Sequence, residues 1–177
     1  MDDFWKSILW RQFGAAIDML DNAIRACPEG LWSANTESPP DASTGAAEFW
    51  YLAYHALFWL DYYSADSPDT FIPPSPFTRS ELDPAGTLPE RVYSKSELLT
   101  YLDHGRNRCG SAIARLTADN APERCAFEWL DLNRAELLLY NMRHVQHHAA
   151  QLNLLLRQTA GSAPHWVRKT EIALASE

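Results

Sequence analysis

Apolar residues recur every three or four positions over four stretches of this chain, a spacing that predicts amphipathic helices. The stretches cover residues 3–27, 46–64, 94–116 and 133–159. A chain of 177 residues with 46% hydrophobic residues is long enough to bury one core. The pattern therefore predicts an all-α fold, a four-helix bundle with long crossover loops that forms a single domain over residues 1–177.

Local sequence signals mark the ends of these helices. Pro28 and Gly30 follow the first stretch, and Gly161 supplies a C-terminal stop after the last one. The third and fourth helices are each expected to begin at a capping box, in which an N-cap side chain is paired with a glutamate three residues later. These pairs are Ser94 with Glu97 and Asn133 with Glu136.

The second predicted helix, residues 46–64, is apolar on all its faces. It carries eight aromatic residues, and His55 lies near its middle. Glu48, His55 and Asp61 interrupt the apolar run, so it does not have the character of a membrane span. A helix of this kind must be covered on most sides, and we expect it to lie inside the bundle or at a subunit interface.

Two connections are rich in proline. Residues 33–45 have loop composition around Pro39 and Pro40, and residues 65–93 hold six of the eleven prolines and show no periodicity. So long a connection is uncommon in a compact domain. It is either a lid across one end of the bundle or a packed crossover between helix ends, and we favour the crossover.

The last connection and the C-terminal tail carry a few apolar residues each. The linker over residues 117–132 is expected to pack against the bundle through three of them, Phe127, Trp129 and Leu130. The tail, residues 162–177, includes Trp166 and Ile172, and its composition allows a short extra helix.

Charge and cysteine content exclude several kinds of partner. The formal net charge is −8, and a nucleic-acid surface would need clustered Lys and Arg that the chain lacks. Cys27, Cys109 and Cys125 are widely spaced and form no Cys-x-x-Cys pair, which argues against a disulfide framework or a thiolate zinc site. The acidic N-terminus lacks the features of a secretory signal. We therefore expect a cytoplasmic protein that binds neither nucleic acid nor membranes.

Three of the six histidines, His144, His147 and His148, fall within five positions of the fourth helix. Residues four apart on an α-helix differ by about 40° in direction and lie about 6 Å apart along the axis, so His144 and His148 can share one small ion. The inner stripe of this helix continues through Gln151 and Leu152, which favours His148 over His147 as the second ligand.

A third ligand from a facing helix would complete such a site and leave positions for water or substrate. His55 is the best donor, because a buried imidazole on an apolar surface needs a partner. We therefore predict one divalent ion, zinc, nickel or another first-row transition metal, bound by His55, His144 and His148. His104 and His165 are expected to have surface or packing roles.

Other metal sites fit this sequence less well. The zincin motif His-Glu-x-x-His has the same ligand spacing, but Val145 stands where its general base would be. A di-iron bundle needs carboxylates and two Glu-x-x-His pairs, which the sequence lacks. Haem ligation by His55 and one histidine of the fourth helix is a further alternative.

These features together resemble a known family. An aromatic second helix with a histidine, a long connection, and the motif His-x-x-His-His-x-x-Gln-Leu over residues 144–152 look like the DinB/YfiT-like superfamily of metal-binding four-helix bundles. The resemblance covers nearly the whole chain and includes the Pro-Glu-Gly-Leu-Trp turn at residues 28–32. It implies a homodimer that binds one divalent ion through three histidines, which correspond to His55, His144 and His148. Ala149-Ala150 stands where the common pattern has Arg-Gly.

Two reactions fit a three-histidine site of this kind. For hydrolysis, Glu48 is the nearest carboxylate by spacing, about two helical turns before His55. For thiol transfer, the resemblance implies an enzyme that uses a low-molecular-weight thiol as a cofactor. Tyr51, Trp59 and Tyr62 are expected to form the wall of a pocket for an apolar small-molecule substrate, with ordinary helix packing as the alternative.

Amides near the histidines are expected to support them. Asn141 and Gln151 are predicted to fix an imidazole tautomer or a bound water, or else to bond each other or the backbone. A non-catalytic module, in which the ion ties the second helix to the fourth and the aromatic surface makes a dimer, is the alternative to an enzyme. A role in the DNA-damage response is suggested only by the family name, and the acidic charge gives it no support.

Overall fold

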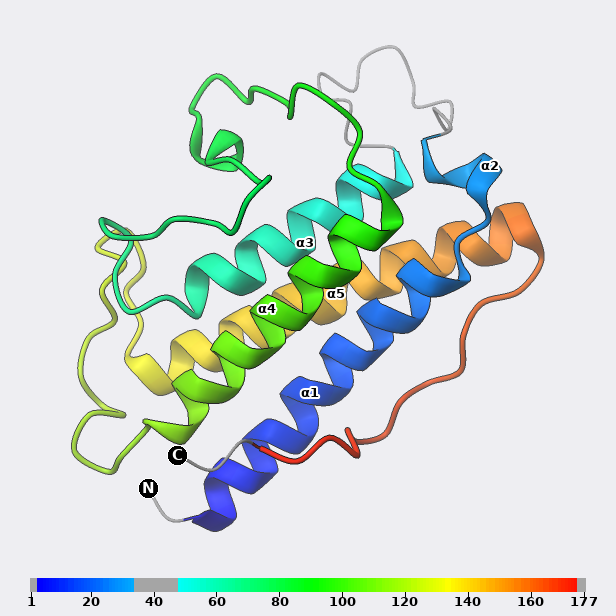
Figure 1. The fold of residues 1–177 in the computed structure, drawn as a ribbon. Coiled ribbons are helices and arrows are strands. Elements are labelled where there is room, and N and C mark those ends of the chain that lie inside the picture. Colours follow the sequence, from blue (N-terminus) through cyan, green and yellow to red (C-terminus); the bar gives the residue numbers. More distant parts are fainter. Residues whose placement is uncertain (1–2, 34–47, 175–177) are drawn as a thin grey trace.

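Four long helices lie side by side as a bundle in the computed structural model, which describes residues 3–33 and 48–174 (Figure 1). All four predicted helices are confirmed, and the described residues form no β-strand. The long helices are α1 (Asp3–Ala26), α3 (Phe49–Tyr63), α4 (Lys95–Ala114) and α5 (Arg134–Ala160), accompanied by the short α2 (Glu29–Trp32) and a 3-10 turn, η1 (Ser80–Leu82).

The helix boundaries follow the predicted signals with one exception. Both capping boxes are formed, with Ser94 and Asn133 each accepting from the backbone of the glutamate three residues later. Gly161 ends α5 in the left-handed conformation, with φ of 73°. Gly30, taken as a stop signal, lies inside α2 instead. A helix of one turn has few intrahelical hydrogen bonds to lose, so the low helix propensity of glycine costs little there.

The aromatic helix α3 lies inside the bundle rather than on its surface. α5 packs against α1 and α3, and α4 packs against the same two helices. Tyr54, Leu57 and Phe58 of α3 are completely buried, as the apolar character of the helix predicts. The predicted loop at residues 34–45 and the predicted start of this helix at residues 46–47 lie outside the described residues.

The proline-rich connection over residues 65–93 is a packed crossover, which is the favoured interpretation of its sequence. It runs across the outside of α3 and α4 (Figure 1). Phe71, Phe77 and Tyr93 anchor it in the core, and the Phe77 ring stacks on Tyr101 of α4 with 4.2 Å between ring centroids. These anchors place η1 against the outer face of α3.

The linker and the tail depart in part from expectation. Phe127 is buried and Leu130 packs against the core. Trp129 is 59% exposed, although its ring stacks on Tyr62 and contacts Phe127. The tail forms no helix up to Leu174, so the predicted short extra helix is absent from the described part of the chain.

Contacts with α1 explain why the tail stays extended. It returns alongside α1 (Figure 1), where the Thr170 amide donates to the Arg11 carbonyl and the Trp10 indole donates to the Ile172 carbonyl. The approach is so close that a Cβ at Gly14 would lie 2.4 Å from the Thr170 methyl group. Backbone groups of the tail therefore form hydrogen bonds with α1, and the tail does not need to be helical for these groups to be satisfied.

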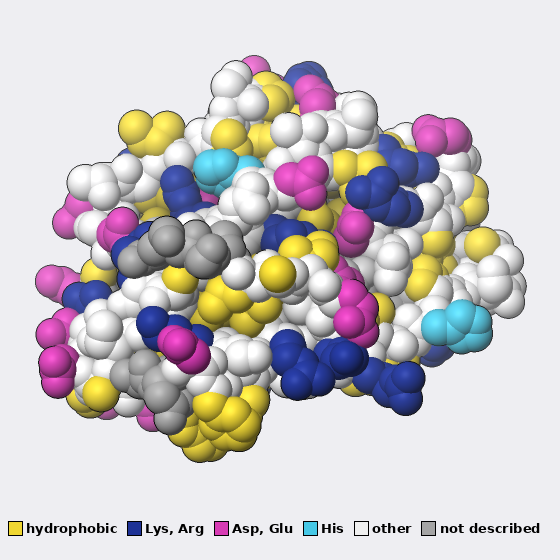
Figure 2. Space-filling model, turned by 60° about the horizontal axis from the view of Figure 1, so that its bottom comes forward, with side chains coloured by type: hydrophobic (Ala, Val, Ile, Leu, Met, Phe, Trp, Pro, Cys, Tyr) yellow, Lys and Arg dark blue, Asp and Glu magenta, His cyan; other side chains and the backbone are white. Residues whose placement is uncertain are grey.

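The surface carries mixed charge. On the face shown in Figure 2, groups of Lys and Arg side chains alternate with Asp and Glu and do not merge into one basic area. Within the described residues, no helix is both long and apolar enough to span a bilayer. Cys27, Cys109 and Cys125 are free thiols, and all three are buried.

Candidate metal centre

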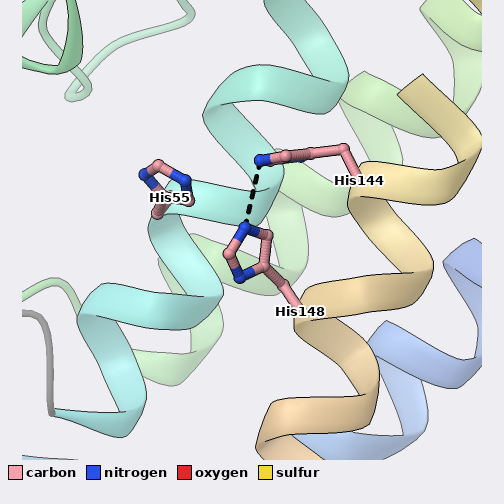
Figure 3. Close-up of side chains that lie close together, drawn as sticks. All are labelled: His55, His144 and His148. Carbon is pink, nitrogen blue, oxygen red and sulfur yellow. Dashed lines mark hydrogen bonds between the residues drawn. The ribbon is translucent and has the colours of Figure 1, made fainter. Parts of the chain in front are cut away.

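The bundle brings the three predicted ligands together. His55 comes from the middle of α3, and His144 and His148 come from successive turns of α5 and point toward it (Figure 3). One ring nitrogen of each lies within 4.8 Å of a ring nitrogen of the other two. The sequence could place two of these histidines on one helix face, and the packing of α3 on α5 supplies the third.

The two histidines of α5 already have the spacing of metal ligands. Their Nε2 atoms are 3.0 Å apart. Metal–nitrogen bonds of about 2.0–2.1 Å in a tetrahedral site separate two ligand atoms by roughly 3.3 Å. The His55 ring centroid lies 4.8 Å from that of His148 and 5.3 Å from that of His144, so His55 is placed to be the third ligand of an ion that the two would hold.

A carboxylate from the crossover holds His55. The Nδ1–H of His55 donates to Glu81 Oε2 over 2.6 Å, and the Trp59 indole donates to the same oxygen over 3.2 Å. The Tyr51 hydroxyl bonds this carboxylate as well. The Glu81 side chain is only 5% exposed. Because the proton is on Nδ1, the lone pair of His55 is on Nε2 and faces the other two histidines.

Glu81 remains ionised in this buried position. Burial by itself raises the pKa of its carboxyl, but the hydrogen bonds from His55, Tyr51 and Trp59 outweigh it and lower the pKa below its usual value. Sequence reasoning missed this residue. Its segment has no helical period, so no spacing rule connects Glu81 with His55, 26 residues earlier.

Gln151 supports the third imidazole as predicted, whereas Asn141 does not. The His148 Nδ1–H donates to Gln151 Oε1 over 2.7 Å, which leaves its Nε2 lone pair toward the cluster. The Asn141 amide donates to the Leu60 carbonyl and to Ser64. Asn141 therefore satisfies a backbone carbonyl near the end of α3, and a hydrogen bond to the backbone was the alternative role considered for this residue.

The tautomer of His144 is not set by an outer partner. Its Nδ1 is buried and has no hydrogen-bond partner among the described residues. With Nδ1–H on His148, the contact between the two Nε2 atoms requires the His144 Nε2 to donate the shared proton. A metal cation can occupy the place of that proton between the same two nitrogens, with His144 changing tautomer.

The proposed pocket wall is divided between two places. Tyr51 and Trp59 flank His55, with ring centroids 6.4 and 6.1 Å from it. Tyr62 instead packs on Phe71 and belongs to the core. The carboxylate of Glu48 accepts from the Trp50 indole, and the carboxylate that reaches His55 is Glu81.

The remaining histidines lie away from the cluster. His147 is exposed, although its ring edge contacts His148 with centroids 5.1 Å apart. His104 pairs with buried Asp61 at 3.3 Å, and His165 is exposed in the tail. These positions agree with the packing and surface roles expected for them.

His144 connects the cluster to a groove of about 640 Å³ between α1, α5 and the tail. Tyr140, His147 and Trp166 line it, together with Ala150. Ala150 is one of the two positions at which the chain departs from the Arg-Gly pattern, and the other, Ala149, is fully buried. Of the two residues that differ from the Arg-Gly pattern, only Ala150 therefore contributes to the lining of the groove.

Two of the histidines are held neutral by their surroundings. Burial, followed by the charge of His148, lowers the pKa of His144 from 6.5 to about 3. Burial is also the main cause that lowers the pKa of His148, to about 4. Neutral imidazoles have the lone pair that a metal ion needs, so the donor set fits a divalent transition metal.

These pKa values predict a pH-dependent stability of the metal-free protein. Both imidazoles bind a proton more readily in the unfolded chain. The free energy of unfolding should therefore fall as the pH drops from about 6.5 toward 3, and these two groups should not change it above 6.5. Urea unfolding of chelator-treated protein at several pH values measures this. The variant His144→Gln should have a flatter profile, and an identical profile would contradict the lowered pKa.

The comparisons with known proteins agree with this geometry. The family model described as the DinB superfamily matches residues 12–152. That range contains all three histidines, Glu81 and Gln151, and it covers most of the chain. Neither the curated proteins nor the solved structures include a match to this chain.

Proposed function

This chain belongs to the DinB superfamily, and we propose that it is a metal-dependent enzyme that joins a low-molecular-weight thiol, through its sulfur, to a small electrophile. Its cluster of three histidines can hold a metal ion. His55, His144 and His148 are the ligands in this proposal. When bound, a divalent ion on three neutral imidazoles supplies Lewis acidity, which stabilises a thiolate or polarises a carbonyl group.

The state of Glu81 favours thiol transfer over hydrolysis, and this observation carries the proposal. Hydrolysis benefits from a free carboxylate that removes a proton from water. Glu81 is the carboxylate that the described residues bring to the cluster, and it already accepts from His55, Trp59 and Tyr51. It therefore positions a ligand instead of acting as a base.

Thiol transfer makes smaller demands on the side chains around the ion. The sulfur forms a bond to an electrophilic carbon, the leaving group departs with the electron pair of its bond, and the thiol proton passes to solvent. The chain has to bind and orient both reactants. Tyr51 and Trp59 present apolar ring surface beside His55, and the groove lined by His144 and Trp166 offers room for a small molecule.

The second candidate is a non-catalytic role, in which the ion only stabilises the fold. The positions of the three ligands, on two different helices, support this role. The three histidines join α3 to α5, so a bound ion would tie two helices that come from distant parts of the chain. Metal would then raise stability without turnover. We propose a homodimer for either role, on the basis of the family.

Turnover assays with defined reactants separate these candidates. Protein loaded with zinc or nickel is mixed with glutathione or cysteine and an activated aryl halide, and separately with a nitrophenyl ester without thiol. Product formation that saturates with thiol and disappears after chelation is expected. Ester hydrolysis alone would make the protein a hydrolase. If metal stabilises the protein but neither assay gives turnover, the non-catalytic role would be supported and both enzymatic roles excluded.

A further inference from the structure

A second polar site lies at the C-terminal end of α3, against α4, and we propose that it binds the phosphate group of a small molecule. The site is a pocket of about 400 Å³ between α4 and the first residues of the crossover. This volume is in the range of small-ligand pockets. The inference does not depend on the metal centre or on the proposed reaction.

One wall of the pocket is a polar stripe of α4. His104, Arg108, Ser111 and Arg115 follow one another at intervals of four, three and four residues, so they share one face of the helix. The opposite wall is formed by the residues that follow α3 and the start of the crossover, and it contributes three hydroxyl groups, those of Ser64, Ser67 and Thr70. The pocket thus contains two guanidinium groups and an imidazole, together with the carboxylate of Asp66.

Buried Asp61 contacts two of these side chains of α4. Its carboxylate is completely buried and lies 2.9 Å from Arg108 Nη1 and 3.3 Å from His104 Nε2, and it accepts from the Tyr101 hydroxyl. The Arg108 guanidinium also lies over the Phe71 ring, 5.8 Å from its centroid. The side chain is thus fixed from two directions before any ligand arrives, which lowers the entropy cost of binding.

Arg108 still has donors to offer. A guanidinium carries five N–H donors, and the described residues take up Arg108 only through its contact with Asp61. Arg115 donates to Asp66 Oδ1 over 2.8 Å, but the Asp66 side chain is 86% exposed. A surface pair of this kind is worth little, so an incoming anion can take the place of Asp66.

The number of donors favours phosphate over carboxylate. A carboxylate has two oxygens to share, whereas a phosphate group presents three strong acceptor oxygens. Arg108, Arg115 and His104 supply charged or aromatic donors from α4, and Ser111, Ser67 and Thr70 supply hydroxyls around them. Forked guanidinium groups bind phosphate oxygens in pairs, which makes the two arginines the main contacts.

Titrations followed by NMR test the site in the full chain. Inorganic phosphate, glycerol 3-phosphate and acetate are added separately while the backbone amides of residues 104–115 and 64–71 are followed. Saturable shifts confined to these segments are expected for both phosphates, with a weaker response to acetate. Tighter binding of glycerol 3-phosphate would identify a phosphate monoester as the ligand, and tighter binding of inorganic phosphate would identify the free anion.

Three variants sharpen the test. Arg115→Gln should weaken phosphate binding about tenfold, since one charge-assisted contact is lost. Asp66→Asn should strengthen it, because the competing carboxylate is removed, and this gain cannot come from a damaged fold. Arg157→Gln, an exposed arginine in the last turn of α5 and outside this pocket, should leave affinity unchanged. Shifts that do not saturate, an equal response to acetate, or unchanged affinity in Arg115→Gln would overturn the proposal.

Discussion

Replacing His148 with alanine is expected to lower the affinity for a divalent metal by more than about 100-fold, since loss of an outer partner alone costs 10–100-fold. His148 contributes one of two ligand atoms that are 3.0 Å apart on α5. In the intact protein, metal at about 100 times its dissociation constant should stabilise the fold by about 2.7 kcal/mol. Calorimetric titration and thermal unfolding with and without metal measure both effects, and the variant should lose both.

His147→Ala is the matched control for this prediction. His147 is the neighbouring residue on the same helix, is exposed, and lies outside the group of convergent nitrogens. Its replacement should leave metal affinity nearly unchanged. If both alanine variants bind metal as the parent does, the assignment of the ligands is wrong.

Removing the carboxylate of Glu81 should have the next largest effect. Glu81→Ala takes away the acceptor that keeps the proton of His55 on Nδ1 and leaves the Trp59 indole without its partner. Metal affinity should fall by about 10–100-fold. Glu81→Gln retains an acceptor oxygen of similar shape and should lose less. The proton on each His55 nitrogen, observed by NMR, should be confined to Nδ1 in the parent and distributed over both nitrogens in Glu81→Ala.

Glu90→Gln controls for a general effect of changing the crossover. Glu90 is an exposed residue of the same segment, away from His55. It should leave both the metal affinity and the His55 tautomer unchanged. Equal losses in Glu81→Ala and Glu90→Gln would mean that the crossover supports the fold and does not position the ligand.

The difference between Gln151 and Asn141 shows how far spacing rules reach. Gln151 lies three residues after His148 on the same helix, so the hydrogen bond between them is local and was predicted. Asn141 lies three residues before His144, at an equivalent spacing, yet its amide points to the Leu60 carbonyl. Asn141 thus donates to a free backbone carbonyl of α3 and not to the histidine on its own helix. This contact depends on how α3 packs against α5, so spacing along α5 could not predict it.

The pattern of this chain determined the four helices, their caps and the pairing of His144 with His148, because each depends on residues within about one or two helical turns of each other. It also singled out His55, since an imidazole on an apolar helix requires a partner. The tertiary structure decided that Glu81 supports His55, that the tail lies extended over Gly14, and that Asp61 gathers His104 and Arg108 at a second pocket. These contacts join residues from separate elements, and their formation depends on how the crossover, the tail and the helices pack.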